Sequence, residues 1–327
     1  MSGAANPKAY ELVLRGHFHR AKGSTEDRQR ALEYFRQAIE ADPKYALAYA
    51  DLSDIYRSLI NSGQLAEAEY LPRARTAAES AIDLDETLAD GQYALANLMT
   101  YGWEWTEAER RYKRSIELNP NLALAHRWYA SYLRLMGRHD QAIAEITRAR
   151  ELDPLSPGVN ATLGFLLLSA GRHDQAREAL EKTLELDRGY PYAYLYLGHV
   201  YMAQRDYENA IAAYRQAAAL GLDTPPTQIA LGSAYAYAGQ TDRARAMAGE
   251  LRDRTKNVSP AELAILMVAL GEREQALTSL ENAFRVRDSH LQQLGVEPGF
   301  DPLRAEPRFT DLLQRIGLGD RAGSSQK

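Results

Sequence analysis

Eight alanines recur along the chain at a nearly constant interval, and this interval constrains the fold more than any other feature of the sequence. The steps from Ala108 to Ala244 are 34 residues each, and the last step, to Ala276, is 32. Each alanine follows a second small residue. The pairs are Gly16 and Ala31, Ser53 and Ala74, Ala96 and Ala108, Ala130 and Ala142, Gly164 and Ala176, Gly198 and Ala210, Gly232 and Ala244, and Ala264 and Ala276. Self-similarity at this period is typical of stacked helical repeats.

The stretch 121–154 shows what one repeat contains. Apolar residues recur at helical spacing on both sides of Gly137, and Pro154 ends the stretch. Glycine enters the left-handed conformation that stops a helix, so the pattern predicts two helices joined by a tight turn. Antiparallel helices can cross closely only where side chains are small, which explains the paired small residues.

Residues 189–222 carry the most complete copy of the pattern, with aromatic, Leu-Gly, aromatic and alanine positions in order. They are Tyr194, Leu197, Gly198, Tyr201, Ala210, Tyr214 and Ala217. This pattern resembles the tetratricopeptide repeat. The resemblance implies an all-α fold, a right-handed α-α superhelix of about eight helical hairpins. We expect units at 9–43, 44–86, 87–120, 121–154, 155–188, 189–222, 223–256 and 257–288.

The two ends of the chain depart from the repeat. Residues 1–8 form a short lead, and the pattern stops after residue 288. An end repeat exposes an apolar face that needs a cap. Residues 289–318 are the candidate cap, because Phe309, Leu312, Leu313 and Ile316 share one face of a predicted helix. We expect 319–327 to be a disordered tail.

A second resemblance covers most of the chain and is carried by residues 101–146, 148–157 and 295–318. These stretches are similar to the repeat region of a class of bacterial proteins. In that class the repeats follow a winged-helix DNA-binding domain, a protein kinase or a nucleotide cyclase. This chain opens almost directly on its first repeat, so we expect a fragment or a stand-alone relative. The resemblance implies regulatory protein–protein interaction.

Composition excludes several functions. The net charge is −5, which argues against nucleic-acid binding by the chain itself, and there is no cysteine for disulfides, thiolate metal sites or thiol catalysis. No apolar run approaches a membrane span and no secretory signal is visible, so we expect a cytoplasmic protein with no membrane association. No metal-binding, phosphate-binding or nucleophile motif is present. We therefore expect no cofactor, no metal site and no enzymatic activity.

The first helix of each unit is expected to line a concave groove. Counting from each small crossing residue predicts a polar N-terminal half and an apolar, aromatic C-terminal half. The candidate peptide-binding residues are Arg20, Arg57, Tyr93, Asn97, Tyr101, Arg127, Arg134, Phe165, His199 and Tyr237. Arginine binds carboxylates through two hydrogen bonds, and tyrosine offers contact area at low entropic cost.

These positions predict a non-catalytic scaffold whose groove binds a protein or peptide that is acidic at one end and apolar at the other. Several alternatives stay open. The arginines can pair with nearby acids such as Asp51 and Asp54, and the apolar half can be filled by the chain's own packing or by a second copy in a homodimer. The groove of a signalling or transcription regulator can also hold a small ligand, and the chain can be a self-associating structural unit.

Overall fold

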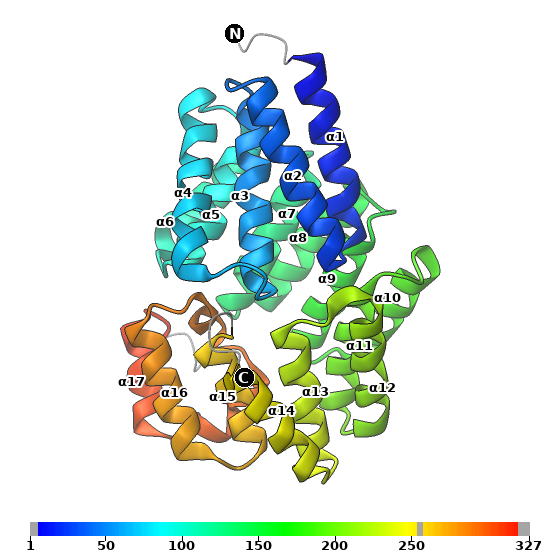
Figure 1. Cartoon of the computed structure of the whole chain (residues 1–327), viewed down its shortest axis with the longest axis vertical. Helices are drawn as coiled ribbons and strands as arrows, with labels where there is room; N and C mark the ends of the chain where they lie inside the picture. Colours follow the sequence, from blue (N-terminus) through cyan, green and yellow to red (C-terminus); the bar gives the residue numbers. More distant parts are fainter. Residues whose placement is uncertain (1–5, 254–257, 320–327) are drawn as a thin grey trace.

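The computed structural model describes residues 6–253 and 258–319. Within this range consecutive helices pair into eight hairpins, α1 with α2 through α15 with α16, and α17 follows (Figure 1). The helices are α1 (Pro7–Lys22), α2 (Thr25–Ala41), α3 (Ala46–Asn61), α4 (Glu67–Leu84), α5 (Ala89–Tyr101), α6 (Trp105–Leu118), α7 (Ala123–Leu135), α8 (His139–Leu152), α9 (Pro157–Ser169), α10 (His173–Leu186), α11 (Pro191–Ala203), α12 (Tyr207–Ala217), α13 (Pro225–Tyr237), α14 (Thr241–Asp253), α15 (Pro260–Ala269), α16 (Arg273–Arg285) and α17 (Pro307–Arg315). The predicted all-α superhelix is confirmed. The expected lead and tail fall largely outside the described residues.

The small residues set the distance between the two helices of a hairpin. All eight repeat alanines are buried, as close crossing requires. The glycines on the first helices make room for a large side chain one turn beyond the alanine. A Cβ on Gly164 would lie 2.5 Å from Leu180 Cγ, and one on Gly198 would lie 2.3 Å from Tyr214 Cε1. The repeat of small residues is therefore a packing requirement.

Two joints differ from the others. The sixth unit ends in a π-helical turn, η1 (Ala218–Leu222), in which Gly221 has a φ of 89°. In the seventh unit Gly232 packs against Leu266 of α15, and Leu251 is buried where other units carry a small residue. This joint brings α13 directly onto α15, the first helix of the last unit.

The end of the solenoid is covered as predicted. Phe309, Leu312, Leu313 and Ile316 are buried, and α17 contacts α16. The segment between the last repeat and α17 forms two 3₁₀ turns, η2 (Ser289–Gln293) and η3 (Pro298–Leu303). We call residues 289–303 the inner segment, because η2 contacts α5 and η3 contacts α15. Its Leu291 and Leu294 have no exposed surface.

The superhelix closes on itself, which the periodicity does not predict. In Figure 1, α15–α17 lie below α4–α6, and α10–α14 lie on the other side of the lower half. Trp105 Nε1 of α6 donates to the carbonyl oxygen of Ile316 at 2.7 Å. On the opposite side Arg28 of α2 donates to the hydroxyl of Tyr192 in α11. The inner wall is therefore more enclosed than an open spring would make it. No helix among the described residues combines the length and apolar character needed to cross a bilayer.

Candidate functional site

The inner wall of the first two units carries a set of ion pairs, which we call the inner-wall network: His17, Arg20, Asp51, Asp54 and Arg57. Arg20 Nη1 lies 3.0 Å from Asp51 Oδ1 and 3.4 Å from Asp54 Oδ2. Arg57 Nη2 lies 2.7 Å from Asp54 Oδ1, and His17 Nε2 lies 2.7 Å from Asp51 Oδ2. Arg20 and Arg57 are thus neutralised by the chain's own carboxylates. The alternative of local pairing is confirmed for Asp54 with Arg57, whereas Asp51 pairs with His17 and Arg20.

The two aspartates of this network are almost completely buried, so the free energy of ionising them depends on the positive charges beside them. Burial alone would raise the pKa of Asp54, but Arg57 and Arg20 outweigh it and lower the pKa. Asp90 of α5 lies near the same network, but nearby positive charges offset the cost of burying its carboxylate less completely. Burial and the Asp51 carboxylate raise the pKa of Asp90 to about 6, against the opposing effect of Arg20 and His17. The inner-wall network thus holds the first two units together by ion pairs. At its edge, Asp90 is a carboxyl group whose burial is not fully offset by the positive charges nearby.

Three predicted groove residues of the third unit do not face solvent. Tyr93, Asn97 and Tyr101 are all buried, which contradicts their expected position on an open wall. Asn97 Oδ1 accepts a hydrogen bond from the Tyr112 hydroxyl at 2.6 Å, so its amide faces α6 of its own hairpin. Arg57 Nη1 lies 3.5 Å from the Tyr101 hydroxyl. Asn97 and Tyr101 are therefore engaged by side chains of α6 and α3, and all three residues are buried in the protein.

Arg127 of α7 stands apart from the other predicted arginines. Its Nε donates to Thr162 Oγ1 at 3.0 Å, and its guanidinium lies 5.0 Å from the Trp128 ring centroid. It forms no ion pair with any described residue and keeps part of its surface accessible. Gly158 leaves space beside it, since a Cβ there would lie 3.1 Å from Arg127 Nη1 and 3.3 Å from the Tyr190 hydroxyl. Arg127 therefore retains its capacity to bind an acid.

Arg134, about two turns further along α7, is buried, so its expected exposure is wrong. The reason is the inner segment: Arg134 Nη2 donates to Gln293 Oε1 at 3.3 Å, and its guanidinium lies 4.7 Å from the Phe165 ring centroid. Burial lowers the pKa of Arg134, although Glu297 of the inner segment acts in the opposite direction. This arginine holds the chain's own C-terminal segment against the inner wall.

Aromatic residues of the fifth and sixth units form a continuous patch, which we call the aromatic patch: Phe165, Tyr196 and His199. Phe165 and Tyr196 stack with centroids 4.7 Å apart, and all three side chains are partly accessible. His199 Nδ1 lies 2.8 Å from the Tyr214 hydroxyl. Burial, with a smaller effect from Arg134, lowers the pKa of His199 to about 4, so the imidazole is neutral at pH 7. The patch offers apolar and stacking contacts without added charge.

Tyr237, the last predicted groove residue, is 43% exposed and stacks on Tyr207 with centroids 5.9 Å apart. It does not contact the aromatic patch in any ring pair of the described residues. The candidate site thus consists of Arg127, Trp128 and the aromatic patch, carried by α7, α9 and α11. These are the first helices of three successive units, which contact one another along the inner wall.

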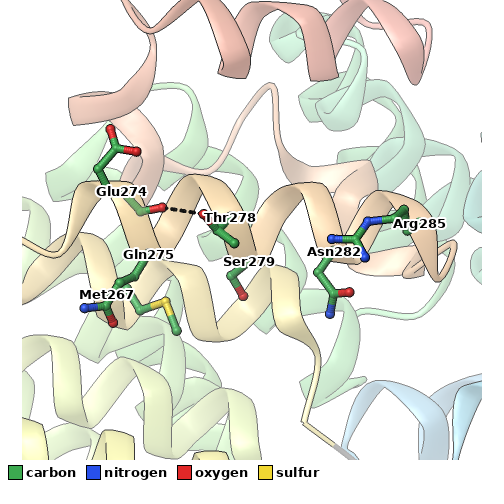
Figure 2. A pocket seen from close by; sticks show the side chains of 7 residues that line it. All are labelled: Met267, Glu274, Gln275, Thr278, Ser279, Asn282 and Arg285. Atoms are coloured by element: carbon green, nitrogen blue, oxygen red, sulfur yellow. Dashed lines mark hydrogen bonds between the residues drawn. The ribbon is translucent and has the colours of Figure 1, made fainter.

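A separate surface hollow of about 490 Å³ lies along α16 (Figure 2). It is lined by Met267, Glu274, Gln275, Thr278, Ser279, Asn282 and Arg285. Its one carboxylate, Glu274, is ion-paired with Arg308 at 3.0 Å, and Thr278 donates to the Glu274 carbonyl oxygen at 2.9 Å. The hollow brings together no acid–base pair and is not a candidate catalytic site.

Sequence reasoning missed Trp128 and Tyr196 of the site, and it also missed two of the site's neighbours. The first neighbour is Tyr190, and the tyrosine-rich stretch 190–196 was the available signal for it and for Tyr196. The second is the inner segment, whose Gln293 and Glu297 approach Arg134 because the superhelix closes on itself. No local pattern could have found that contact, because it depends on the total curvature of eight units.

Comparison with known proteins agrees with the fold. Four sequence models described as tetratricopeptide repeat match the chain at 133–197 and 167–226, at 34–70, at 103–157 and at 20–45. Together the matches cover more than half of the chain. No curated protein sequence matches it.

Two solved structures are similar over nearly the whole chain. A chain of the APC/C hetero-tetramer Cut9-Hcn1 is 21% identical with a TM-score of 0.62, and the match covers 93% of this chain and 55% of that one. Yeast Tom70 is 16% identical with a TM-score of 0.53, and the match covers 95% of this chain and 68% of that one. This chain therefore spans about half the length of the matched Cut9-Hcn1 chain. The sequence matches, the hairpin geometry and these likenesses together show that the chain belongs to the tetratricopeptide repeat family.

Proposed function

We propose that this chain is a non-catalytic protein-binding scaffold whose inner wall takes a peptide segment with an acidic group at Arg127 and apolar anchors on the aromatic patch. Stacked helical repeats offer extended concave surfaces of this kind. The proposal places the chain in the cytoplasm and gives it no nucleic-acid or membrane partner of its own, in keeping with its net charge of −5.

The free guanidinium of Arg127 carries the proposal. Of the four arginines expected in the groove, Arg20 and Arg57 are neutralised by buried aspartates and Arg134 is buried beneath the inner segment. Among residues 6–253 and 258–319, the hydrogen-bond partner of its guanidinium is the neutral hydroxyl of Thr162 alone. A carboxylate from a partner would gain a charge-assisted, two-point contact there without displacing an existing ion pair.

The surroundings of Arg127 suit a bound segment. The Trp128 ring centroid lies 3.9 Å from the Arg57 guanidinium and 5.0 Å from the Arg127 guanidinium. Phe165 and Tyr196 follow on the next two units and remain partly accessible. Arginine and large aromatic residues dominate binding energy at protein interfaces, so this grouping fits an acidic residue followed by apolar anchors.

The test selects peptides from a random library displayed on phage and measures the enriched sequences by fluorescence anisotropy. Arg127→Glu should weaken their binding by about 2 kcal/mol or more, since it replaces an attractive contact by a repulsive one. Arg148→Glu is the matched control, because Arg148 lies on a second helix and is exposed and paired with Glu151 at 3.0 Å. Equal affinity of both variants for the selected peptides would refute the placement of the acidic group at Arg127.

A further inference from the structure

One face of the first helix, α1, carries a row of exposed apolar side chains, which we call the α1 stripe: Tyr10, Leu14 and Phe18. They are spaced four residues apart, so they lie one above the other, and their exposed fractions are 52%, 48% and 61%. In Figure 1, α1 lies at the outer edge of the upper half. The other large exposed apolar side chains of the described residues each lie at or just beyond the end of a different helix. They are Leu84, Leu155, Leu186, Tyr237 and Val286. Single apolar side chains on a surface are ordinary, whereas a continuous row is typical of an interaction surface.

The internal repeat shows what this face does in the other units. Phe18 lies two residues after the small crossing residue, and the same position is apolar and buried in the seven other units. These residues are Ile55, Leu98, Tyr132, Leu166, Val200, Ala234 and Leu266. Leu266 packs against Gly232 of the preceding unit. The Tyr132 hydroxyl donates to the carbonyl oxygen of Trp105, also in the preceding unit, at 2.9 Å. Phe18 thus occupies a position that a neighbouring helix covers elsewhere in the solenoid.

A further helical hairpin does not fit this face, because two other stacking positions of α1 are charged. In later units these positions contact the second helix of the unit before. A Cβ on Gly91 would lie 3.2 Å from Ile82 Cγ1, and the Tyr129 hydroxyl donates to a carboxylate of α6 at 3.1 Å. In α1 the same positions hold Glu11 and Arg15, which pair at 2.6 Å and are both more than half exposed. Burying this pair under a second helix would be costly, so the α1 stripe has room for a single helix.

The charges beside the α1 stripe favour a second copy of α1 as that helix. Glu11 and Arg15 lie on the same side of the stripe, about one helical turn apart. If two α1 helices pair antiparallel about a two-fold axis near Leu14, Glu11 of each copy faces Arg15 of the other. The same arrangement places Tyr10 opposite Phe18. The face is therefore self-complementary both in its apolar contacts and in its charges.

We propose that two copies of this chain associate through antiparallel pairing of their α1 helices along the α1 stripe. Three apolar side chains per copy cover much less than the about 800 Å² per partner that a stable complex buries. The dimer is therefore weak and reversible, and its dissociation constant should exceed about 1 µM.

Sedimentation equilibrium of the untagged full-length chain, at concentrations up to several hundred micromolar, tests the pairing. We expect the apparent mass to rise with concentration from that of one chain toward that of two. Leu14→Glu should keep the chain monomeric, because it brings two carboxylates together at the two-fold axis. Leu155→Glu is the matched control, since Leu155 is an exposed leucine that stands alone in the turn after α8, and it should dimerise as the unaltered chain does. Circular dichroism checks that both variants are folded.

Charge reversal tests the antiparallel arrangement. Glu11→Arg or Arg15→Glu alone should raise the dissociation constant several-fold, because each creates two repulsive contacts across the axis. The double variant should regain the affinity of the unaltered chain, since opposite charges face each other again. A chain that stays monomeric at every concentration, or Leu14→Glu dimerising as well as Leu155→Glu, would overturn the proposal and leave the α1 stripe to a helix of another protein. Failure of the double variant to regain affinity would refute the antiparallel pairing.

Discussion

Replacing Gly198 by alanine tests the packing rule that the repeat imposes. A Cβ at this position would lie 2.3 Å from Cε1, 2.5 Å from Cδ1 and 2.8 Å from Cζ of Tyr214. Ordinary contact begins near 3.4 Å, so the ring would have to move by about 1 Å. Tyr214 is 1% exposed and its hydroxyl is 2.8 Å from His199 Nδ1, which leaves the ring little freedom to move away.

The expected magnitude is the sum of two opposing effects. Overpacking a close-packed interior costs about 1–3 kcal/mol, and the severe overlap here places Gly198→Ala at the upper end of that range. Alanine is the better helix former and returns about 0.5–1 kcal/mol inside α11. We therefore expect a net loss of roughly 2 kcal/mol in the free energy of unfolding.

Gly249→Ala provides the matched control, because Gly249 lies inside α14 and a Cβ there would meet no atom within 4 Å. It should gain about 0.5–1 kcal/mol from helix propensity alone. Urea unfolding followed by circular dichroism should place the midpoint of Gly198→Ala below, and that of Gly249→Ala above, the unaltered chain. If Gly198→Ala were as stable as Gly249→Ala, the small residue would not be a packing requirement and the reasoning would fail.

Three further predictions concern the wall and its closure. Arg134→Glu should lower the free energy of unfolding by about 3 kcal/mol or more, because it buries a carboxylate near Glu297. Partly exposed Arg127→Glu should cost less than about 1 kcal/mol, and the melting temperatures of the two variants should differ accordingly. Asp90→Asn should stabilise the protein at pH 7 by up to about 3 kcal/mol, since the raised pKa of Asp90 makes stability fall as pH rises from about 4 to about 6. Urea titrations at pH 3.5 and pH 7 should show that this gain disappears at the lower pH. Trp105→Phe removes the donor to Ile316 and should cost about 1–3 kcal/mol, with faster hydrogen exchange in α17 as the specific sign of a loosened cap.

The helical hairpins could be predicted from the sequence because they depend on contacts between residues that are close together in the chain. The pairing of Gly164 with Leu180 or of Gly198 with Tyr214 spans only 16 residues and recurs in phase, so periodicity reveals it. The capping helix was predictable for the same reason, since Phe309, Leu312, Leu313 and Ile316 form one apolar face. For the wall, the sequence prediction named Arg127, Phe165 and His199, and these side chains are partly accessible, although their role in binding stays a prediction. It assigned Tyr93, Asn97 and Arg134 to an open surface that they do not reach.

Only the tertiary structure decided which parts of the inner wall stay open. The contacts from Arg28 to Tyr192, Trp105 to Ile316 and Glu67 to Ser289 join residues 164, 211 and 222 positions apart. Each depends on the rotation accumulated over several stacked units, and a small change in any one joint moves the far end by many ångströms. A repeat pattern fixes what each unit looks like but not the sum of their rotations. For that reason the alanine spacing determined the hairpins, while closure of the superhelix decided that Arg127 stays partly accessible and that Arg134 is buried.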